Sequence, residues 1–136
     1  MEGSLNILLI EDDPAIVKLI TEELRLELGS WTYLECASRL SAACESLVAG
    51  EFDAIVADLS VSNGSMSALT STLRSFAPET PLFVILDEAQ EDLARDAGKM
   101  GVDACFFKHE IHNRNWLERV SKSVEHRRAA LRTSDN

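Results

Sequence analysis

The stretch NILLIEDDPAIVKLI, residues 6–20, joins an aliphatic run to three consecutive carboxylates and a proline. The run at residues 5–10 is apolar almost throughout, as expected of a strand that is covered on both faces. Apolar residues then recur at three- and four-residue spacing, which predicts a helix over Pro14–Leu28. The stretch therefore predicts a strand, a short acidic loop and a helix, the first half of a βαβ unit.

The same alternation of short aliphatic runs and helical segments continues to the end of the chain. Glycines at positions 29, 50 and 101 stand where helices should end. The run at 31–36 alternates apolar and polar residues, which is typical of an edge strand. The pattern predicts an α/β fold, a doubly wound five-stranded parallel sheet with helices on both faces. Further strands are expected at 31–36, 53–58, 82–86 and 103–107, and further helices at 39–49, 65–76, 90–100 and 113–131.

Composition limits the classes of function that the chain can have. Its 136 residues suit one domain with its own core, and the formal net charge of −10 argues against binding nucleic acid through phosphate contacts. No apolar run approaches the ~20 residues that cross a bilayer, and the acidic start does not resemble a signal peptide, so we expect a cytoplasmic location. Cys36, Cys44 and Cys105 form no CxxC pair and are expected to be reduced, buried side chains.

Acidic residues follow two of the predicted strands. Pro14 suits the first position of a helix, which makes Asp13 the expected N-cap. Glu11 and Asp12 are then left in the loop, and the third strand ends with Asp58. If the first and third strands flank the switch in strand order, these acids meet at one edge of the sheet, where clustered like charge favours a divalent cation, above all Mg²⁺. Alternatively, Glu11 and Asp12 have only a structural role, in which their negative charges complement the dipole at the start of the predicted helix.

A lysine directly follows the last predicted strand. Lys108 follows the run at 103–107 and is expected at the same edge of the sheet as Asp58, although a solvated lysine after a strand is common. An ammonium there would pair with a phosphate group. Acids, Mg²⁺ and a lysine around one aspartate indicate a site that takes a phosphoryl group onto that carboxylate.

Three blocks of this chain together resemble the receiver domain of bacterial two-component response regulators: ILLIEDDP at 7–14, DAIVADLSVSNGSM at 53–66 and GVDACFFKHE at 101–110. The resemblance implies a flavodoxin-like (βα)5 fold and a histidine kinase or phosphotransfer protein as partner. It implies that Glu11 and Asp12 organise Mg²⁺, that Asp58 is phosphorylated and that Lys108 pairs with the phosphate. The backbone carbonyl of Ser60 would complete the protein's share of the metal ligands.

Several positions depart from the pattern of this family. Ser62 and Met66 stand where its members usually have proline and glycine, which predicts a less rigid loop and weaker Mg²⁺ binding. Leu86 stands where a Thr or Ser hydroxyl would contact the phosphoryl group. Asp87 occupies a position that is normally small, so its carboxylate is expected near the approach of a phosphodonor and should slow the transfer or shorten the lifetime of the product.

The aromatic switch position and the proline after the lysine also differ. Cys105, three residues before Lys108, stands at the aromatic switch position, and His109, directly after Lys108, stands where the family has the proline. The coupling between hydroxyl and aromatic ring that the family uses is therefore expected to be altered. Phe106 and Phe107 are read as core residues rather than as substitutes for the switch.

Two other classes of function stay open. The first is a pseudo-receiver, which would use the same fold as a protein-binding module without phosphorylation. The second is a phosphoaspartyl hydrolase, but such enzymes place a second Asp two residues after the nucleophile, where this chain has Ser60. We therefore expect a signalling domain and no enzymatic turnover.

The C-terminal segment is expected to begin as the last core helix. Residues 1–125 are assigned to the receiver domain, and 126–136 to a polar helix end that resembles the start of a linker to an output domain. The partner that carries the output would be such a domain or a separate effector protein. No room remains for a DNA-binding module with its own core. Dimerisation through the last two helices, as in many family members, stays open. His109 and His112 are read as exposed loop residues, since no third ligand for a metal is near.

Overall fold

A computed structural model describes residues 5–29, 32–111 and 115–134 of this chain. Its five strands form one parallel sheet in the order β2-β1-β3-β4-β5. The alternation of strands and helices predicts the parallel sheet, and the resemblance to receiver domains implies this flavodoxin-like order. The second strand lies at an edge, as its polar alternation indicates. The strands are β1 (Leu5–Ile10), β2 (Thr32–Ala37), β3 (Ala54–Asp58), β4 (Leu82–Leu86) and β5 (Ala104–Phe107).

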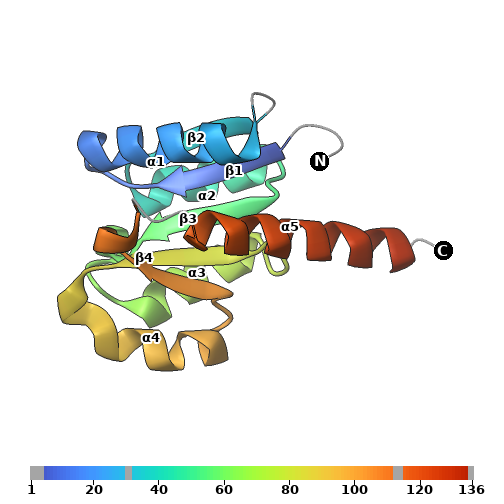
Figure 1. The fold of residues 1–136 in the computed structure, drawn as a ribbon. Coiled ribbons are helices and arrows are strands. Elements are labelled where there is room, and N and C mark those ends of the chain that lie inside the picture. The colour runs from blue at the N-terminus through green and yellow to red at the C-terminus, as the bar shows by residue number, and fades with distance from the viewer. Residues whose placement is uncertain (1–4, 30–31, 112–114, 135–136) are drawn as a thin grey trace.

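Helices cover both faces of the sheet (Figure 1). Side chains of α1 and α5 pack on one face, and side chains of α2, α3 and α4 pack on the other. Asp13 caps α1 as expected, since its Oδ1 accepts the Ala15 N–H at 2.9 Å and Pro14 follows it. The helices are α1 (Pro14–Leu28), α2 (Leu40–Ala49), α3 (Met66–Phe76), α4 (Glu91–Ala97) and α5 (Asn115–Ser134).

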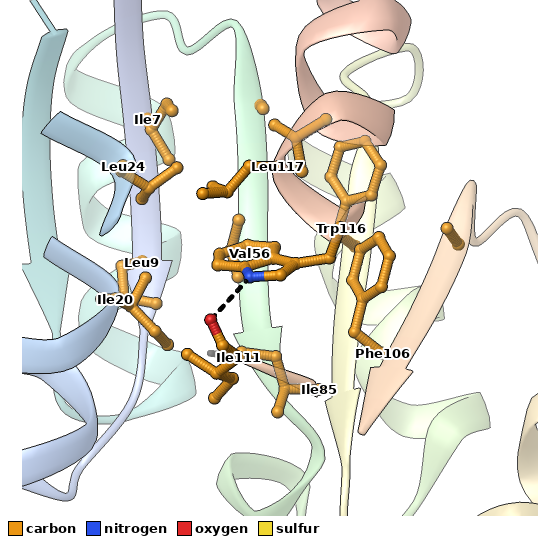
Figure 2. Close-up of a cluster of buried hydrophobic side chains, with 14 of the residues drawn as sticks. Ile7, Leu9, Ile20, Leu24, Val56, Ile85, Phe106, Ile111, Trp116 and Leu117 are labelled. Atoms are coloured by element: carbon orange, nitrogen blue, oxygen red, sulfur yellow. Dashed lines mark hydrogen bonds between the residues drawn. The ribbon is translucent and has the colours of Figure 1, made fainter. Parts of the chain in front are cut away.

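One half of the core lies beneath α5 (Figure 2). Trp116 is 2% exposed and lies 5.6 Å from the ring of Phe106, centroid to centroid. Its indole Nε1–H donates to the Ile111 carbonyl oxygen at 3.1 Å, so the polar atom of this buried ring is satisfied. β3 and β4 are buried at every position, which confirms that their apolar runs lie between two layers of helices.

Two predicted strands start one residue later than expected, for a common physical reason. Asp53 and Asp103 precede β3 and β5, and their carboxylates accept the backbone N–H groups of Asn6 at 2.8 Å and Leu82 at 2.7 Å. Each acid therefore satisfies a backbone amide at the start of the neighbouring strand. The predicted helix 90–100 is shorter as an α-helix, because 3₁₀ turns occupy 88–90 and 98–100 at its two ends.

Other bounds lie near the predictions. The glycines at 29, 50 and 101 do follow the ends of helical segments. Residues 31, 112 and 113, to which the sequence assigns a strand start, a loop histidine and a helix start, lie outside the described residues. α5 runs unbroken past residue 125, where the sequence places the end of the domain, and continues to Ser134. None of the described helices is long and apolar enough to span a membrane.

The prediction of buried cysteines is wrong for one of the three. Cys36 is exposed, whereas Cys44 and Cys105 are partly buried. Cys36 lies near the end of the edge strand β2, where residues 33, 35 and 36 are all exposed. The apolar neighbours of Cys36 in the sequence do not reveal this, because the exposure of an edge strand depends on what packs against it.

Candidate functional site

The carboxyl ends of the parallel strands bring the predicted acids and the lysine to one edge of the sheet. In the register of the sheet, Ile10 of β1 pairs with Ala57 of β3, so the next residues along, Glu11 and Asp58, are neighbours. β4 adjoins β3 and ends at Leu86, and β5 adjoins β4 and ends one residue before Lys108. The edge that the switch in strand order defines therefore carries the candidate site.

Glu11 and Asp58 are both buried, with 3% and 2% of their surface exposed. Backbone amides hold one oxygen of each carboxyl group. Oε1 of Glu11 accepts the Asp13 N–H at 3.0 Å, and Oδ1 of Asp58 accepts the Ser60 N–H at 2.8 Å. The other oxygens, Oε2 and Oδ2, are buried without a hydrogen-bond partner. Such orphaned oxygens are costly unless a cation meets them.

Lys108 is the cation that the protein itself supplies. Its Nζ lies 3.2 Å from Oδ2 of Asp58, and about a third of its side chain is exposed. The ammonium therefore reaches from the end of β5 across β4 to the end of β3. This contact places Lys108 where the sequence predicts it, beside the candidate phosphoacceptor.

Burial and the contact between the two carboxyl groups shift the pKa values of the two acids apart. Burial, followed by contact with the Asp58 carboxyl, raises the pKa of Glu11 to about 8. Burial alone would raise the pKa of Asp58 as well, but contacts with Glu11, Ser60 and Lys108 outweigh it and lower that pKa. Without a metal, the two shifts favour a proton on Glu11 beside an ionised Asp58.

The remaining predicted metal ligands lie in the adjoining loops. Asp12 is exposed, and the carbonyl oxygen of Ser60 accepts the Asn63 N–H at 3.0 Å. Within the described part of the chain, no three His, Cys, Asp or Glu side chains gather closely enough to hold a metal ion by themselves. Two buried acids nevertheless fit Mg²⁺, which commonly uses one or two carboxylates and fills its shell with water and phosphate oxygens. Oε2 of Glu11 has no hydrogen-bond partner, and Oδ2 of Asp58 is met only by the ammonium of Lys108.

The loop after Asp58 is fixed by its own hydrogen bonds. The hydroxyl of Ser62 lies 3.1 Å from the Leu59 carbonyl oxygen and 2.8 Å from that of Ser65. Asn63 takes a left-handed conformation with φ of 55°, and Met66 is buried at the first position of α3. Ser62 and Met66 thus fill structural roles here, and the predicted weakening of Mg²⁺ binding stays a prediction.

Asp87 lies at the same edge of the sheet, as the sequence predicts, and it also contacts Lys108. Its Oδ1 is 3.2 Å from Nζ of Lys108, so the lysine contacts two carboxylates. The next residue also pairs across the site, since Glu88 Oε1 lies 3.0 Å from Nδ1 of His109. Sequence reasoning missed the pairing of Glu88 with His109, and the adjacent charges at 87–88 and 108–109 were the signal that could have suggested it.

A wide hollow lies elsewhere. It measures about 920 Å³ and is bordered by Gly50–Asp53, Ala77–Thr80 and the end of α5. Two of its charged residues, Asp53 and Arg128, pair with each other at 3.0 Å. Since the hollow lies at the amino ends of the strands and is not lined by Glu11, Asp58 or Lys108, the candidate site stays at the edge that carries Asp58.

Comparison with protein families identifies the class to which this fold and this site belong. The family model for the response regulator receiver domain matches residues 7–120. The match covers most of the chain and includes Glu11, Asp58 and Lys108. The chain belongs to the response regulator receiver domain family, whose members act in two-component signalling. No curated protein matches it.

Solved structures share the fold at low sequence identity. The CheY-like receiver domain protein from Methanospirillum hungatei JF-1 superposes with a TM-score of 0.79 at 17% identity, covering 94% of this chain and 99% of that one. The receiver domain of sensor histidine kinase PA1611 from Pseudomonas aeruginosa PAO1 gives 0.73 at 19% identity, covering 90% and 99%. That structure holds a magnesium ion in its active-site cleft.

Proposed function

We propose that this receiver domain accepts a phosphoryl group on Asp58 from the phosphohistidine of a histidine kinase or of a phosphotransfer protein. The observation that carries the proposal is the buried Asp58 carboxylate, paired with Lys108 at 3.2 Å beside the buried Glu11. Oδ2 of Asp58 is the nucleophile, because Oδ1 is already engaged by the Ser60 amide. An O–P bond forms as the P–N bond of the donor breaks, and the electron pair leaves on the imidazole.

Each neighbouring group has a defined task in this transfer. Lys108 neutralises charge on the phosphoryl oxygens, as a point charge within reach of Oδ2. Glu11 and Asp12 would hold Mg²⁺ together with Asp58 and the Ser60 carbonyl oxygen, and the bound ion would supply charge neutralisation for the incoming phosphate. Water later attacks phosphorus, which releases inorganic phosphate and restores the carboxylate. The domain acts as a phosphoryl carrier rather than as an enzyme with an external substrate.

Intact mass spectrometry tests this proposal. The protein is incubated with acetyl phosphate, with and without Mg²⁺, beside its Asp58→Asn variant. We expect a Mg²⁺-dependent phosphoryl adduct on the wild type and none on the variant, which retains its fold. An adduct of equal yield on Asp58→Asn would show that another residue is the acceptor.

A second function is supported by two residues of β4 and its following loop. Leu86 brings no hydroxyl to the site, and Asp87 places a second carboxylate on Lys108. Both features favour a pseudo-receiver that binds a partner protein without phosphorylation. The absence of any adduct, under conditions that fully label an ordinary receiver domain, would favour this function over the first.

A further inference from the structure

Lys108 is shared between two carboxylates that differ in their exposure to solvent. Its Nζ lies 3.2 Å from Oδ2 of Asp58 and 3.2 Å from Oδ1 of Asp87. The Asp58 side chain is 3% exposed, whereas that of Asp87 is 55% exposed. The lysine therefore joins the buried end of β3 to the exposed connection between β4 and α4.

β4 offers no other link between Asp58 and that connection. Its last residue, Leu86, is fully buried and aliphatic, so it donates no hydrogen bond. The next polar side chain is Asp87, an acceptor that repels a phosphoryl oxygen instead of binding it. A change of charge on Asp58 can thus reach the connection through the ammonium of Lys108.

The connection is held at further points. Glu88 pairs with His109 at 3.0 Å, directly beside the pair of Asp87 with Lys108. The side-chain oxygen of Gln90 accepts the Asp87 N–H at 2.8 Å, which shapes the turn before α4. Residues 87–90 therefore form a compact turn that contacts the 108–109 segment through the ion pair of Asp87 with Lys108 and the contact of Glu88 with His109.

We propose that Asp87 is a positioning residue that competes with a phosphoryl group on Asp58 for Lys108, so that phosphorylation releases the turn at 87–90. The inference rests on the proposed phosphorylation of Asp58. A phosphoryl group carries about two negative charges, against one on Asp87, and it sits on the buried partner. The half-exposed Asp87 is screened by solvent, so the ammonium moves to the phosphoryl oxygens.

The competition between Asp87 and a phosphoryl group can be measured as a change in the affinity for a phosphoryl mimic. An exposed ion pair contributes little, so removing the charge of Asp87 should strengthen the binding of a phosphoryl mimic by about two- to fivefold. Beryllofluoride in the presence of Mg²⁺ serves as the mimic, because it occupies an aspartate without a covalent transfer. Backbone amide NMR signals report both its affinity and the state of residues 88–90.

The experiment compares the wild type with three variants. Asp87→Asn removes the charge and keeps the shape, Asp87→Glu keeps the charge, and Asp92→Asn is the control. Asp92 is 90% exposed on α4 and pairs with Arg95 at 2.8 Å, away from Lys108. We expect tighter binding only for Asp87→Asn. In the other three proteins, beryllofluoride should shift the amide signals of residues 88–90. In Asp87→Asn without beryllofluoride, these signals should already lie close to their positions in the beryllofluoride-bound wild type.

Each alternative result has a definite meaning. Equal affinity of Asp87→Asn and the wild type, with unmoved signals at 88–90, would overturn the inference and leave the phosphorylation of Asp58 standing. Tighter binding by Asp87→Glu as well would assign the effect to loop shape instead of charge and would also overturn it. If beryllofluoride bound to Asp87→Asn and to none of the other three proteins, the result would support the inference, because Asp87 would then exclude the mimic completely. A failure of all four proteins to bind would overturn the proposed function together with this inference.

Discussion

Nη2 of Arg128 lies 3.0 Å from Oδ1 of Asp53, and this ion pair attaches the later turns of α5 to the start of β3. Both side chains are only 21% exposed, and the second oxygen of Asp53 accepts the Asn6 N–H at 2.8 Å. Asp53 thus joins β1, β3 and α5. The contact shows that helix residues beyond 125 pack on the receiver fold.

Replacing Asp53 with Ala should destabilise the domain by about 1–3 kcal/mol, because it removes the acceptor of the partly buried Asn6 N–H and the carboxylate that the Arg128 guanidinium contacts. Urea unfolding, followed by circular dichroism, measures the change. Asp96→Ala is the control, since Asp96 is 65% exposed and lies 3.7 Å from Lys99. It should change the free energy of unfolding by no more than about 0.5 kcal/mol. Equal midpoints for both variants would show that the Asp53 contacts contribute nothing.

Trp116→Phe tests the core beneath α5 (Figure 2). The smaller ring leaves a cavity beside Phe106, and the buried carbonyl oxygen of Ile111 loses the indole donor. We expect a loss of about 1–3 kcal/mol in the free energy of unfolding. Leu131→Ala on the same helix is the control, because Leu131 is 43% exposed and should tolerate the change. Comparable losses in the two variants would contradict the central position of Trp116.

The parallel sheet and the meeting of acids at one edge follow from features that are local in the sequence. Apolar runs of five or six residues can be buried on both faces only inside a layered sheet, and βαβ connections have one hand. Once the strands are parallel, residues that directly follow them share an edge. The neighbouring positions of Glu11, Asp58 and Lys108 were therefore predictable from their places after three strands.

The missed features depend on pairing between residues far apart in the chain. Asp53 and Asp103 look like strand residues, yet they cap neighbouring strands, and only the register shows this. Arg74 donates to the carbonyl oxygens of Thr80 and Gly101 and lies 3.6 Å from Asp103, so it ties α3 to the turns that lead into β4 and β5. No spacing in the sequence distinguishes Arg74 from a solvated arginine.

Lys108→Ala should slow the transfer of phosphate to Asp58 by roughly ten- to a hundredfold, the loss expected when a charged contact to the reacting group is removed. Labelling with acetyl phosphate and Mg²⁺, sampled over time by intact mass, gives the rate. Lys99→Ala is the control, since that side chain is 84% exposed and lies on the 3₁₀ turn after α4. Equal rates for Lys108→Ala and the wild type would remove Lys108 from the phosphate site.

Glu11 makes the stability of the metal-free domain depend on pH. Its pKa is raised from 4.5 to about 8 by burial and by the Asp58 carboxyl, so the folded state favours the protonated form. The associated stability is fully present below the pKa of the unfolded chain, and it is lost as pH rises through the folded value. We therefore expect the urea midpoint, measured with a chelator present, to fall between about pH 5 and 8.

Glu11→Gln should flatten this fall, because a neutral amide loses no proton in the same window. The exposed Glu22→Gln on α1 is the control and should keep the wild-type slope. Mg²⁺ should also oppose the fall in the wild type at pH 8, since the ionised carboxylate is the form that binds a cation. A slope for Glu11→Gln equal to that of the wild type would place the pH dependence in another group and would separate Glu11 from the proposed metal ligands.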